Sequence, residues 1–537
     1  MERTQTYPLA AAVRDAYRAG EDDETMEPLV LVEDGRPVGR IEDGDYVIFY
    51  NIRGEREIQL TRAFVDDQFP HFEREPMVTH WTTMIEYHPD LDTRVAFPPP
   101  GVVRDTLSET VSRAGRRQVK IVESEKQVHL TTFLNGGREE PFPGEARIVV
   151  DSVDFEGYLP PPAMRAEDVA EAAIRALQDE SVHLLVVNWA NVDVIGHGED
   201  RDAIMAAVSA VDTQLGRVLE VARAMDVTAL VTADHGTVEK WYYPDGSIDT
   251  GHTDSDVPFV LVAPSAANQR GGGLGLTVRA GGSLIDVAPT VLALMGIQKP
   301  PAMTGTSLVG GVAGGGARRV ALLILDGWGA RDEEWGNLIA QTDTPVMDGL
   351  LAHHPAVRLQ AAGEAVGLPD QIPNRGGKTV GNSEVGHVHI GAGRIITSDR
   401  LRIERSIEDG SFFQNPALLS AMEGTRDDGG ALHLLGIISF YSSHGSVEHL
   451  KALLRMAKRV GVPRVYVHGM LGRRGEKPES GAIYVADIEA ECRRLGIGRF
   501  VSLIGRFWSL DREENWDRIE RSYRWLAHGD GRPVDPS

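Results

Sequence analysis

Short apolar runs that end in polar residues recur along this chain and limit the folds open to it. The clearest runs span 183–190, 228–232, 258–262 and 319–325, and they alternate with segments of helical periodicity. Apolar runs of this length, bounded by turn residues, are typical of buried strands. Strands that alternate with helices predict an α/β fold with largely parallel sheets, whose carboxyl ends would bring the polar residues to one shared edge.

The chain has 537 residues, more than one hydrophobic core usually serves, so we expect two domains and at most three. A hydrophobic content of 42% and a charged content of 25% are those of an ordinary globular protein rather than a disordered one. Amphipathic helices are predicted over 201–225, 446–460, 480–495 and 515–527.

The charge and the cysteine content of the chain limit which binding partners and which cellular compartment we expect. Asp and Glu total 79 against 55 Lys and Arg, and the net charge of −24 argues against a broad nucleic-acid-binding face or an anionic membrane partner. No apolar run approaches the length of a membrane span, and the opening residues lack the apolar core of a signal peptide. The single Cys492 cannot form an internal disulfide. We therefore expect a cytoplasmic protein without nucleic-acid or membrane partners.

Aspartate and histidine residues gather at or after the predicted strands. The set is Asp193, His197, Asp234, His235, His252 and Asp326. Each of them alone is more often an N-cap or a surface side chain, so the prediction of a metal site depends on their number and positions. Mixed carboxylate and imidazole donors suit Mn²⁺ or Zn²⁺ better than an all-oxygen Ca²⁺ site.

The segment Gly381-Asn-Ser383-Glu-Val-Gly-His387 is a turn of small residues that would expose Ser383. A serine hydroxyl is a weak nucleophile until its pKa falls, and a bound divalent metal achieves this without a partner histidine. No Gly-x-Ser-x-Gly sequence surrounds Ser383, which disfavours an acyl-transfer hydrolase. The nearby Gly376-Gly-Lys-Thr379 lacks the first glycine and the preceding strand of a phosphate-binding P-loop, so we interpret it as a chance match.

Together these motifs resemble the cofactor-independent (2,3-bisphosphoglycerate-independent) phosphoglycerate mutases of the alkaline phosphatase superfamily. The resemblance covers nearly the whole chain, and its motifs are specific. They lie at 59–64, 125–126, 133–137, 140–145, 191–197, 232–236, 252–253, 326–329, 336–337 and 381–387. The resemblance implies an alkaline-phosphatase-like domain with a parallel sheet flanked by helices, and a second α/β domain.

The order of the motifs departs from that of the family, which begins with the strand ending in Asp-Gly-Trp-Gly and finishes with Met-Thr-Gly-x-Ser-Leu. Here Met303-Thr-Gly-Thr-Ser-Leu308 runs through the glycine-rich stretch 309–318 into the strand that ends at Asp326. Composition alone would fit a surface loop at 309–318, whereas the resemblance implies a linker between fused termini and a circularly permuted order. The implied domains are a metal-binding phosphatase-like domain over 102–397 and a second, substrate-binding transferase domain built from 1–101 and 398–537.

The resemblance also implies the metal ligands and the nucleophile. One metal ion would be held by Asp193, His197 and His252, and the other by Asp326, Ser383, Asp234 and His235. The resemblance implies two divalent ions. Mn²⁺ is the first candidate for both, and Zn²⁺ or Mg²⁺ are the alternatives. In the family, the counterpart of Ser383 takes the phosphoryl group as phosphoserine and returns it to the other hydroxyl of the glycerate.

A small phosphorylated carboxylate or phosphonate is the substrate class that the resemblance implies. The implied catalytic residues are Ser383, Lys126, His444 and Arg474. The implied substrate-binding residues are Arg53, Arg56, Lys126, His444, Arg474, Arg506 and Arg512. Because only eight of the 55 basic residues are Lys, the match at Lys126 is the more telling one.

Two acids of the family pattern are replaced where the glycerate end of the substrate would bind. Phe440 and Gly475 stand in their places, and Glu476 lies one residue away from the second. Three readings stay open: a monomeric phosphoglycerate mutase-like phosphotransferase, a diverged transferase acting on a related small phosphate or phosphonate in specialised metabolism, and a phosphatase with water as acceptor. A catalytically dead binding or scaffold protein is disfavoured, because drift would hardly keep seven metal-site residues while losing others nearby.

Overall fold

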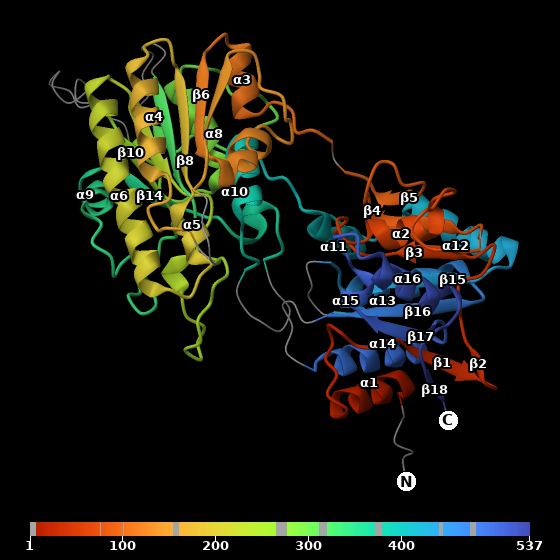
Figure 1. Cartoon of the computed structure of the whole chain (residues 1–537). Helices are drawn as coiled ribbons and strands as arrows, with labels where there is room; N and C mark the ends of the chain where they lie inside the picture. Colours follow the sequence, from red (N-terminus) through yellow and green to blue (C-terminus); the bar gives the residue numbers. More distant parts are fainter. Residues whose placement is uncertain are drawn as a thin grey trace. The chain divides into compact units, whose positions relative to one another are not determined.

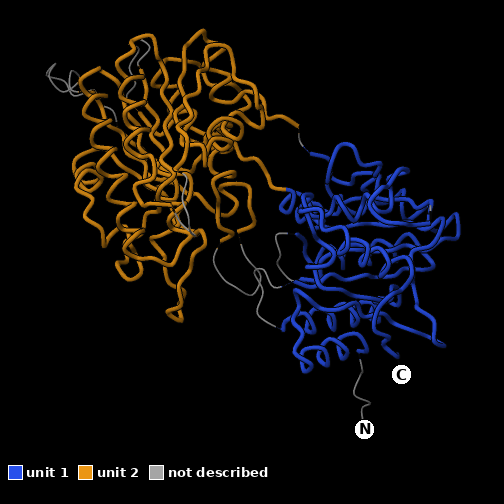
Figure 2. Tube along the Cα trace, in the orientation of Figure 1, with its two compact units in different colours: residues 1–99, 399–537 blue, residues 100–398 orange. Residues whose placement is uncertain are grey.

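The computed structural model describes residues 7–75, 77–99, 101–153, 160–264, 277–310, 319–370, 378–439, 444–472 and 479–536. The chain divides into two compact units (Figure 2). Unit 1 comprises residues 1–99 and 399–537, and unit 2 comprises residues 100–398. Each unit has its own hydrophobic core.

The described part of unit 2 contains a sheet of seven strands in the order β14-β10-β9-β13-β8-β6-β7 (Figure 1). The strands are β6 (Gln118–Glu123), β7 (Glu145–Val150), β8 (Leu184–Trp189), β9 (Thr228–Thr232), β10 (Val257–Val262), β13 (Val320–Leu325) and β14 (Ala356–Leu359). The block from β9 to β7 is parallel, which confirms the predicted α/β fold. The central strand β13 is buried along its whole length, as its continuous apolar sequence predicts.

One part of the strand prediction is wrong. The run 258–262 forms β10, but β10 is antiparallel to both β9 and β14. Its carboxyl end therefore lies at the opposite edge from those of the parallel strands. A strand buried on both faces is apolar throughout whichever way it runs, so the sequence pattern carries no sign of its direction.

Helices cover both faces of this sheet (Figure 1). On one face lie α4 (Ala166–Gln178), α6 (Arg201–Ala224) and α9 (Pro345–His353), and on the other lie α3 (Leu107–Arg113), α8 (Val287–Leu294) and α10 (Ser383–Ala392). The longest, α6, begins after Asp200, whose carboxylate accepts hydrogen bonds from the backbone of Asp202 and Ala203. Its apolar side chains recur every three or four residues, which buries one stripe against the core.

The predicted linker 309–318 is described only at its start. Val309 and Gly310 form β12 (Val309–Gly310), which pairs antiparallel with β11 (Thr277–Val278). The remaining positions, 311–318, lie outside the described residues.

The described part of unit 1 contains a sheet of nine strands in the order β18-β1-β17-β16-β15-β3-β4-β5, with β2 paired to β1. The strands are β1 (Leu29–Glu33), β2 (Arg36–Pro37), β3 (Tyr46–Phe49), β4 (His80–Ile85), β5 (Arg94–Phe97), β15 (Leu432–Ile437), β16 (Val465–Leu471), β17 (Arg499–Gly505) and β18 (Arg532–Val534). The block from β17 to β5 is parallel, and β3 lies between β15 and β4. Segments from both halves of the chain therefore build one sheet.

Unit 1 also carries the remaining predicted helices. Its helices are α1 (Pro8–Arg18), α2 (Ile58–Val65), α11 (Asp399–Asp409), α12 (Pro416–Asp428), α13 (Val447–Val460), α14 (Gly481–Leu495), α15 (Arg506–Ser509) and α16 (Trp516–Ala527). The helices predicted from periodicity over 446–460, 480–495 and 515–527 are confirmed as α13, α14 and α16. Across the described residues, we find no helix with the length and apolar character that a membrane crossing requires.

Candidate metal centre

The carboxyl ends of four parallel strands of unit 2 carry the residues predicted from the sequence. Lys126 ends the short helix η1 (Ser124–Lys126) after β6, and Asp326 directly follows β13. Asp193 lies in α5 (Asn191–Gly196) after β8, while Asp234 and His235 follow β9. Because these strands are parallel neighbours, their ends lie at one edge of the sheet.

The first group of possible ligands joins one carboxylate to two imidazoles. Asp193 Oδ1 lies 3.1 Å from His252 Nε2 and 3.5 Å from His197 Nε2. The two imidazole Nε2 atoms are 3.2 Å apart. Each ring places its Nδ1 on a backbone oxygen, at 2.8 Å from Thr250 O for His197 and 3.0 Å from Gly381 O for His252. These carbonyls favour the Nδ1–H tautomer, which leaves both Nε2 atoms directed at the Asp193 carboxylate.

The second group surrounds the candidate nucleophile. Ser383 begins α10, and its Oγ lies 3.1 Å from both Asp326 Oδ1 and His235 Nε2. Asp193, His235 and Asp326 each offer one ligand atom within 4.8 Å of the others. Asp234 Oδ1 accepts hydrogen bonds from the backbone N–H groups of His235 and Gly327 at 3.1 and 3.3 Å.

Lys126 joins the carboxylates to the nucleophile. Its Nζ lies 2.6 Å from Asp193 Oδ2, 3.0 Å from Asp326 Oδ1 and 2.5 Å from Ser383 Oγ. The side chain is buried, which by itself disfavours the ammonium form. The carboxylates of Asp326, Asp193 and Asp234 outweigh this burial and hold the pKa of Lys126 above its ordinary value.

The same charges set the electrostatics of the ligands. Burial would raise the pKa of Asp193 and Asp326, but the Lys126 ammonium outweighs it and holds both below their usual range. Burial would likewise lower the pKa of His235, but the carboxylates of Asp234 and Asp193 raise it to about 10. The centre is thus a buried anionic cluster that stabilises positive charge placed within it.

Two supporting residues have no role assigned by the sequence. Asn188 is the second-last residue of β8, and its side-chain amide donates a hydrogen bond to Asp326 Oδ2 at 2.8 Å. The same amide nitrogen lies 3.1 Å from His387 Nε2, and His387 Nδ1 lies 2.7 Å from the backbone oxygen of Ser383. His387 lies in the motif 381–387 and Asn188 in the apolar run 183–190, but nothing in the sequence distinguishes a supporting amide or imidazole from a ligand.

The residues present fit divalent cations. Three buried aspartates face four histidines and form three overlapping groups that could each hold an ion. The groups are Asp193 with His197 and His252, Asp193 with His235 and Asp326, and Asp234 with Asp326 and His387. Asp234 Oδ2 is buried and accepts no hydrogen bond from the described residues, although it lies 3.3 Å from His387 Nδ1. A buried carboxylate oxygen in this state is costly unless a cation is bound to it. Nitrogen and carboxylate donors together match Mn²⁺ or Zn²⁺ chemistry.

The predicted substrate-binding arginines lie in unit 1. Arg53 and Arg512 both pair with Glu55, with closest N–O distances of 3.0 and 2.9 Å. Arg56 Nη1 donates to Leu510 O at 3.0 Å. Arg506, which is buried, places Nη2 at 3.4 Å from His444 Nε2. The loop after β3 and the region around α15 therefore bring these basic residues together with His444.

Several predicted residues cannot be placed. Arg474, Phe440, Gly475 and Glu476 lie outside the described residues.

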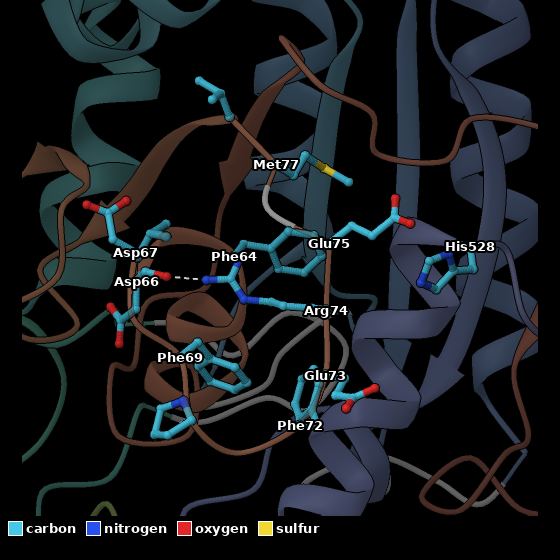
Figure 3. Close-up of a pocket in the computed structure, with 13 residues that line it drawn as sticks. Phe64, Asp66, Asp67, Phe69, Phe72, Glu73, Arg74, Glu75, Met77 and His528 are labelled. Carbon is cyan, nitrogen blue, oxygen red and sulfur yellow. Dashed lines mark hydrogen bonds between the residues drawn. The ribbon is translucent and has the colours of Figure 1, made fainter.

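A separate pocket of about 920 Å³ in unit 1 is lined by residues between 64 and 75, by Met77 and Val78, and by His528 (Figure 3). It is lined by aromatic side chains such as Phe69 and by carboxylates, and Arg74 donates to the backbone oxygen of Asp66. None of its described lining residues is a predicted site residue, although Phe64 ends the motif at 59–64.

Two family models match the chain. The model of the metalloenzyme superfamily matches residues 32–299, and that of the BPG-independent PGAM N-terminus matches residues 403–536. The chain is thus similar to the metalloenzyme superfamily over residues 32–299 and to the BPG-independent phosphoglycerate mutases over residues 403–536.

Three curated relatives are each named 2,3-bisphosphoglycerate-independent phosphoglycerate mutase. The protein of Thermomicrobium roseum is 42% identical over 313 residues, and that of Moorella thermoacetica is 41% identical over 310 residues; each alignment covers 57% of this chain and 58% of the relative. The protein of Listeria monocytogenes is 38% identical over 300 residues, covering 55% of this chain and 57% of the relative. Each alignment thus spans less than two thirds of the relative. A crystal structure of Leishmania mexicana phosphoglycerate mutase shares 29% identity with a TM-score of 0.38, covering 52% of this chain and 53% of the other.

Proposed function

We propose that this chain is a metal-dependent phosphotransferase that moves a phosphoryl group through Ser383 and interconverts 3-phosphoglycerate and 2-phosphoglycerate. The observation that carries the proposal is the position of Ser383 Oγ, which contacts Lys126, His235 and Asp326 at once. Relatives that bear the mutase name, each aligned over part of its length, support this substrate class.

Two divalent ions are part of the proposal, with Mn²⁺ as the first candidate. One would be held by Asp193, His197 and His252, and the other by Asp326, Ser383, Asp234 and His235. When bound, such ions lower the pKa of a serine hydroxyl and stabilise charge on a transferring phosphoryl group.

The protein groups around Ser383 support this chemistry in three ways. The Lys126 ammonium contacts Oγ and can stabilise negative charge that develops on it. Ser383 is the first residue of α10, where the helix dipole and the backbone N–H groups favour an anionic group. Asn188 holds Asp326 in place by a direct hydrogen bond.

In unit 1, we propose that basic residues bind the anionic substrate. These are Arg53, Arg56, His444, Arg474, Arg506 and Arg512. Arginine suits the carboxylate and phosphate of phosphoglycerate because its guanidinium can form paired hydrogen bonds. We further propose that the protein acts as a monomer in the cytoplasm.

A circularly permuted order is also part of the proposal. The family model described as an N-terminus matches residues 403–536, after the superfamily match at 32–299. Unit 2 is continuous in sequence, from residue 100 to residue 398, and contains the glycine-rich stretch 309–318. Both observations are expected if the original termini were joined through that stretch, with domains at 102–397 and at 1–101 with 398–537.

The function is tested by incubating the protein and Mn²⁺ with 3-phosphoglycerate while 2-phosphoglycerate and free phosphate are followed together. Interconversion without phosphate release supports the proposal. Phosphate release alone would identify a phosphatase, and neither product would favour a related small phosphate or phosphonate as substrate. Ser383→Ala should abolish the reaction, whereas the matched variant Ser209→Ala, on the exposed side of α6 in the same unit, should not.

A further inference from the structure

Glu57 is a fully buried carboxylate that the sequence did not single out. It immediately precedes α2 and has no exposed surface. Its Oε1 accepts from Asn51 Nδ2 at 2.7 Å and lies 2.9 Å from His444 Nδ1. Its Oε2 accepts the backbone N–H of Arg56 at 3.1 Å. A buried carboxylate needs such partners, and here one of them is an imidazole from a distant part of the chain.

The contacts of the His444 ring fix which nitrogen carries the proton. A guanidinium only donates hydrogen bonds, so Arg506 Nη2, at 3.4 Å, faces Nε2 as an acceptor. A carboxylate only accepts, so the ring proton lies on Nδ1 and is donated to Glu57. Glu57 and Arg506 thus select the same tautomer from opposite sides of the ring.

The surrounding backbone holds this pair in place. Ile52 N donates to His444 O at 2.7 Å, and Ile437 N donates to Asn51 Oδ1 at 2.9 Å. These bonds tie the end of β3 to the end of β15, two parallel neighbours in the sheet. A Cβ on Gly445 would lie 2.7 Å from the Ile437 side chain, so the backbone next to His444 can approach this closely because residue 445 is glycine.

A carboxylate on Nδ1 is the device by which a histidine becomes an effective base. The carboxylate orients the ring, fixes the tautomer and stabilises the imidazolium once Nε2 has taken a proton. Other charged groups near this ring are Arg506, its partner Glu24 at 3.5 Å, and Arg56. Among these groups, Glu57 is the carboxylate in direct contact with the imidazole.

We propose that Glu57 is a positioning residue that holds His444 so that Nε2 accepts the proton of the substrate hydroxyl that receives the phosphoryl group. This inference rests on the proposed function. The O–H bond of that hydroxyl breaks, its electron pair stays on oxygen, and the proton forms an N–H bond at Nε2 while Glu57 stabilises the imidazolium. In the reverse direction, the imidazolium returns the same proton to the oxygen.

Glu57→Gln tests the role because glutamine keeps the size of the side chain and removes its charge. We expect kcat for interconversion to fall at least about tenfold, within the range of general-base contributions, with KM changed far less. Phosphorylation of Ser383 by substrate should remain. Glu57→Asp should restore part of kcat, and Glu33→Gln, which removes an exposed carboxylate of unit 1 paired with Arg499, should match the unaltered protein.

A second measurement does not depend on activity or on the folding of a variant. NMR of the full chain labelled with heavy nitrogen at histidine, assigned with His444→Asn, reports the tautomer directly. We expect Nδ1–H in the unaltered protein. An Nε2–H tautomer would overturn the inference, as would Glu57→Gln with an unchanged kcat or with an effect on KM alone. Failure of the proposed function would look different, because the unaltered protein would then leave Ser383 unphosphorylated.

Discussion

Lys126 Nζ lies 2.5 Å from Ser383 Oγ, so the one ammonium in this cluster contacts the hydroxyl assigned to phosphoryl transfer. The same nitrogen contacts the carboxylates of Asp193 and Asp326. Lys126 therefore neutralises part of a buried anionic cluster as well as facing the nucleophile. Its loss should affect both the stability of the protein and its chemistry.

Lys126→Met should destabilise the metal-free protein by about 3 kcal/mol, because removing one partner of a buried ion pair leaves the carboxylates uncompensated. Bound Mn²⁺ should offset most of this loss by supplying positive charge to the same carboxylates. Urea unfolding with a chelator and with Mn²⁺ measures both values. Lys240→Met is the control, since its ion pair with Asp254 is partly exposed and should cost less than about 1 kcal/mol. Equal destabilisation of Lys126→Met with and without Mn²⁺ would contradict this account.

Asn188→Leu should weaken Mn²⁺ binding about 10- to 100-fold, the usual cost of losing a group that orients a metal ligand. The amide donates to Asp326 and also faces His387, so both lose a fixed partner. Mn²⁺ titration by calorimetry gives the affinity. Gln341→Ala, an exposed amide in the same unit, should bind Mn²⁺ as the unaltered protein does. Unchanged affinity in Asn188→Leu would show that Asp326 does not need this hydrogen bond.

His449 should make the protein acid-sensitive. Its ring is fully buried, and neither ring nitrogen has a hydrogen-bond partner among the described residues. Burial, with the positive charge of Arg400, lowers the pKa of His449 to about 3. Below the unfolded pKa of about 6.5, the unfolded chain binds the proton and the folded protein does not, so stability falls as the pH drops towards 3.

His449→Leu should remove this component. Its free energy of unfolding should depend less on pH between about 4 and 6.5. The difference in stability between the variant and the unaltered protein should shift in favour of the variant by about 3 kcal/mol between pH 7.5 and pH 4.5. Urea unfolding at several pH values measures the difference. Parallel pH profiles for the two proteins would contradict a buried neutral imidazole at this position.

Moving the chain ends to the glycine-rich stretch should preserve the fold. A chain that begins at residue 319, ends at residue 310 and joins residue 537 to residue 1 by a flexible linker keeps β12 and β13 whole. Opening a connection of this composition changes mainly loop entropy, so we expect a folded and active protein. A break inside β13, between Leu322 and Leu323, is the control and should prevent folding. If both rearranged chains fail alike, the permuted order is not supported.

Much of the fold could be predicted because buried strands and amphipathic helices leave clear patterns. The runs that became β8, β9 and β13 are mostly apolar and buried at every position, since helices cover both faces of the sheet. The edge strand β7 is only partly buried and mixes polar with apolar residues, so it gave no such signal. The direction of β10 could not be predicted because burial does not depend on direction.

Some residues of the candidate sites could likewise be predicted from the sequence, and others could not. Asp326, Asp234 and His235 could be located because each follows a recognisable strand. Glu57 could not be predicted, because a glutamate before a helix is usually exposed and its partner His444 lies 387 residues away in the chain. Only the pairing of β3 with β15 brings these two side chains together.

Mapping the phosphorylated residue tests the account most closely. The protein is incubated with Mn²⁺ and 3-phosphoglycerate, quenched in acid and digested, and the phosphopeptides are identified by mass spectrometry. We predict phosphate on Ser383, appearing as fast as turnover requires and absent from Ser383→Ala. Phosphate on a different residue, or interconversion by a protein in which Ser383 is never phosphorylated, would contradict transfer through this serine.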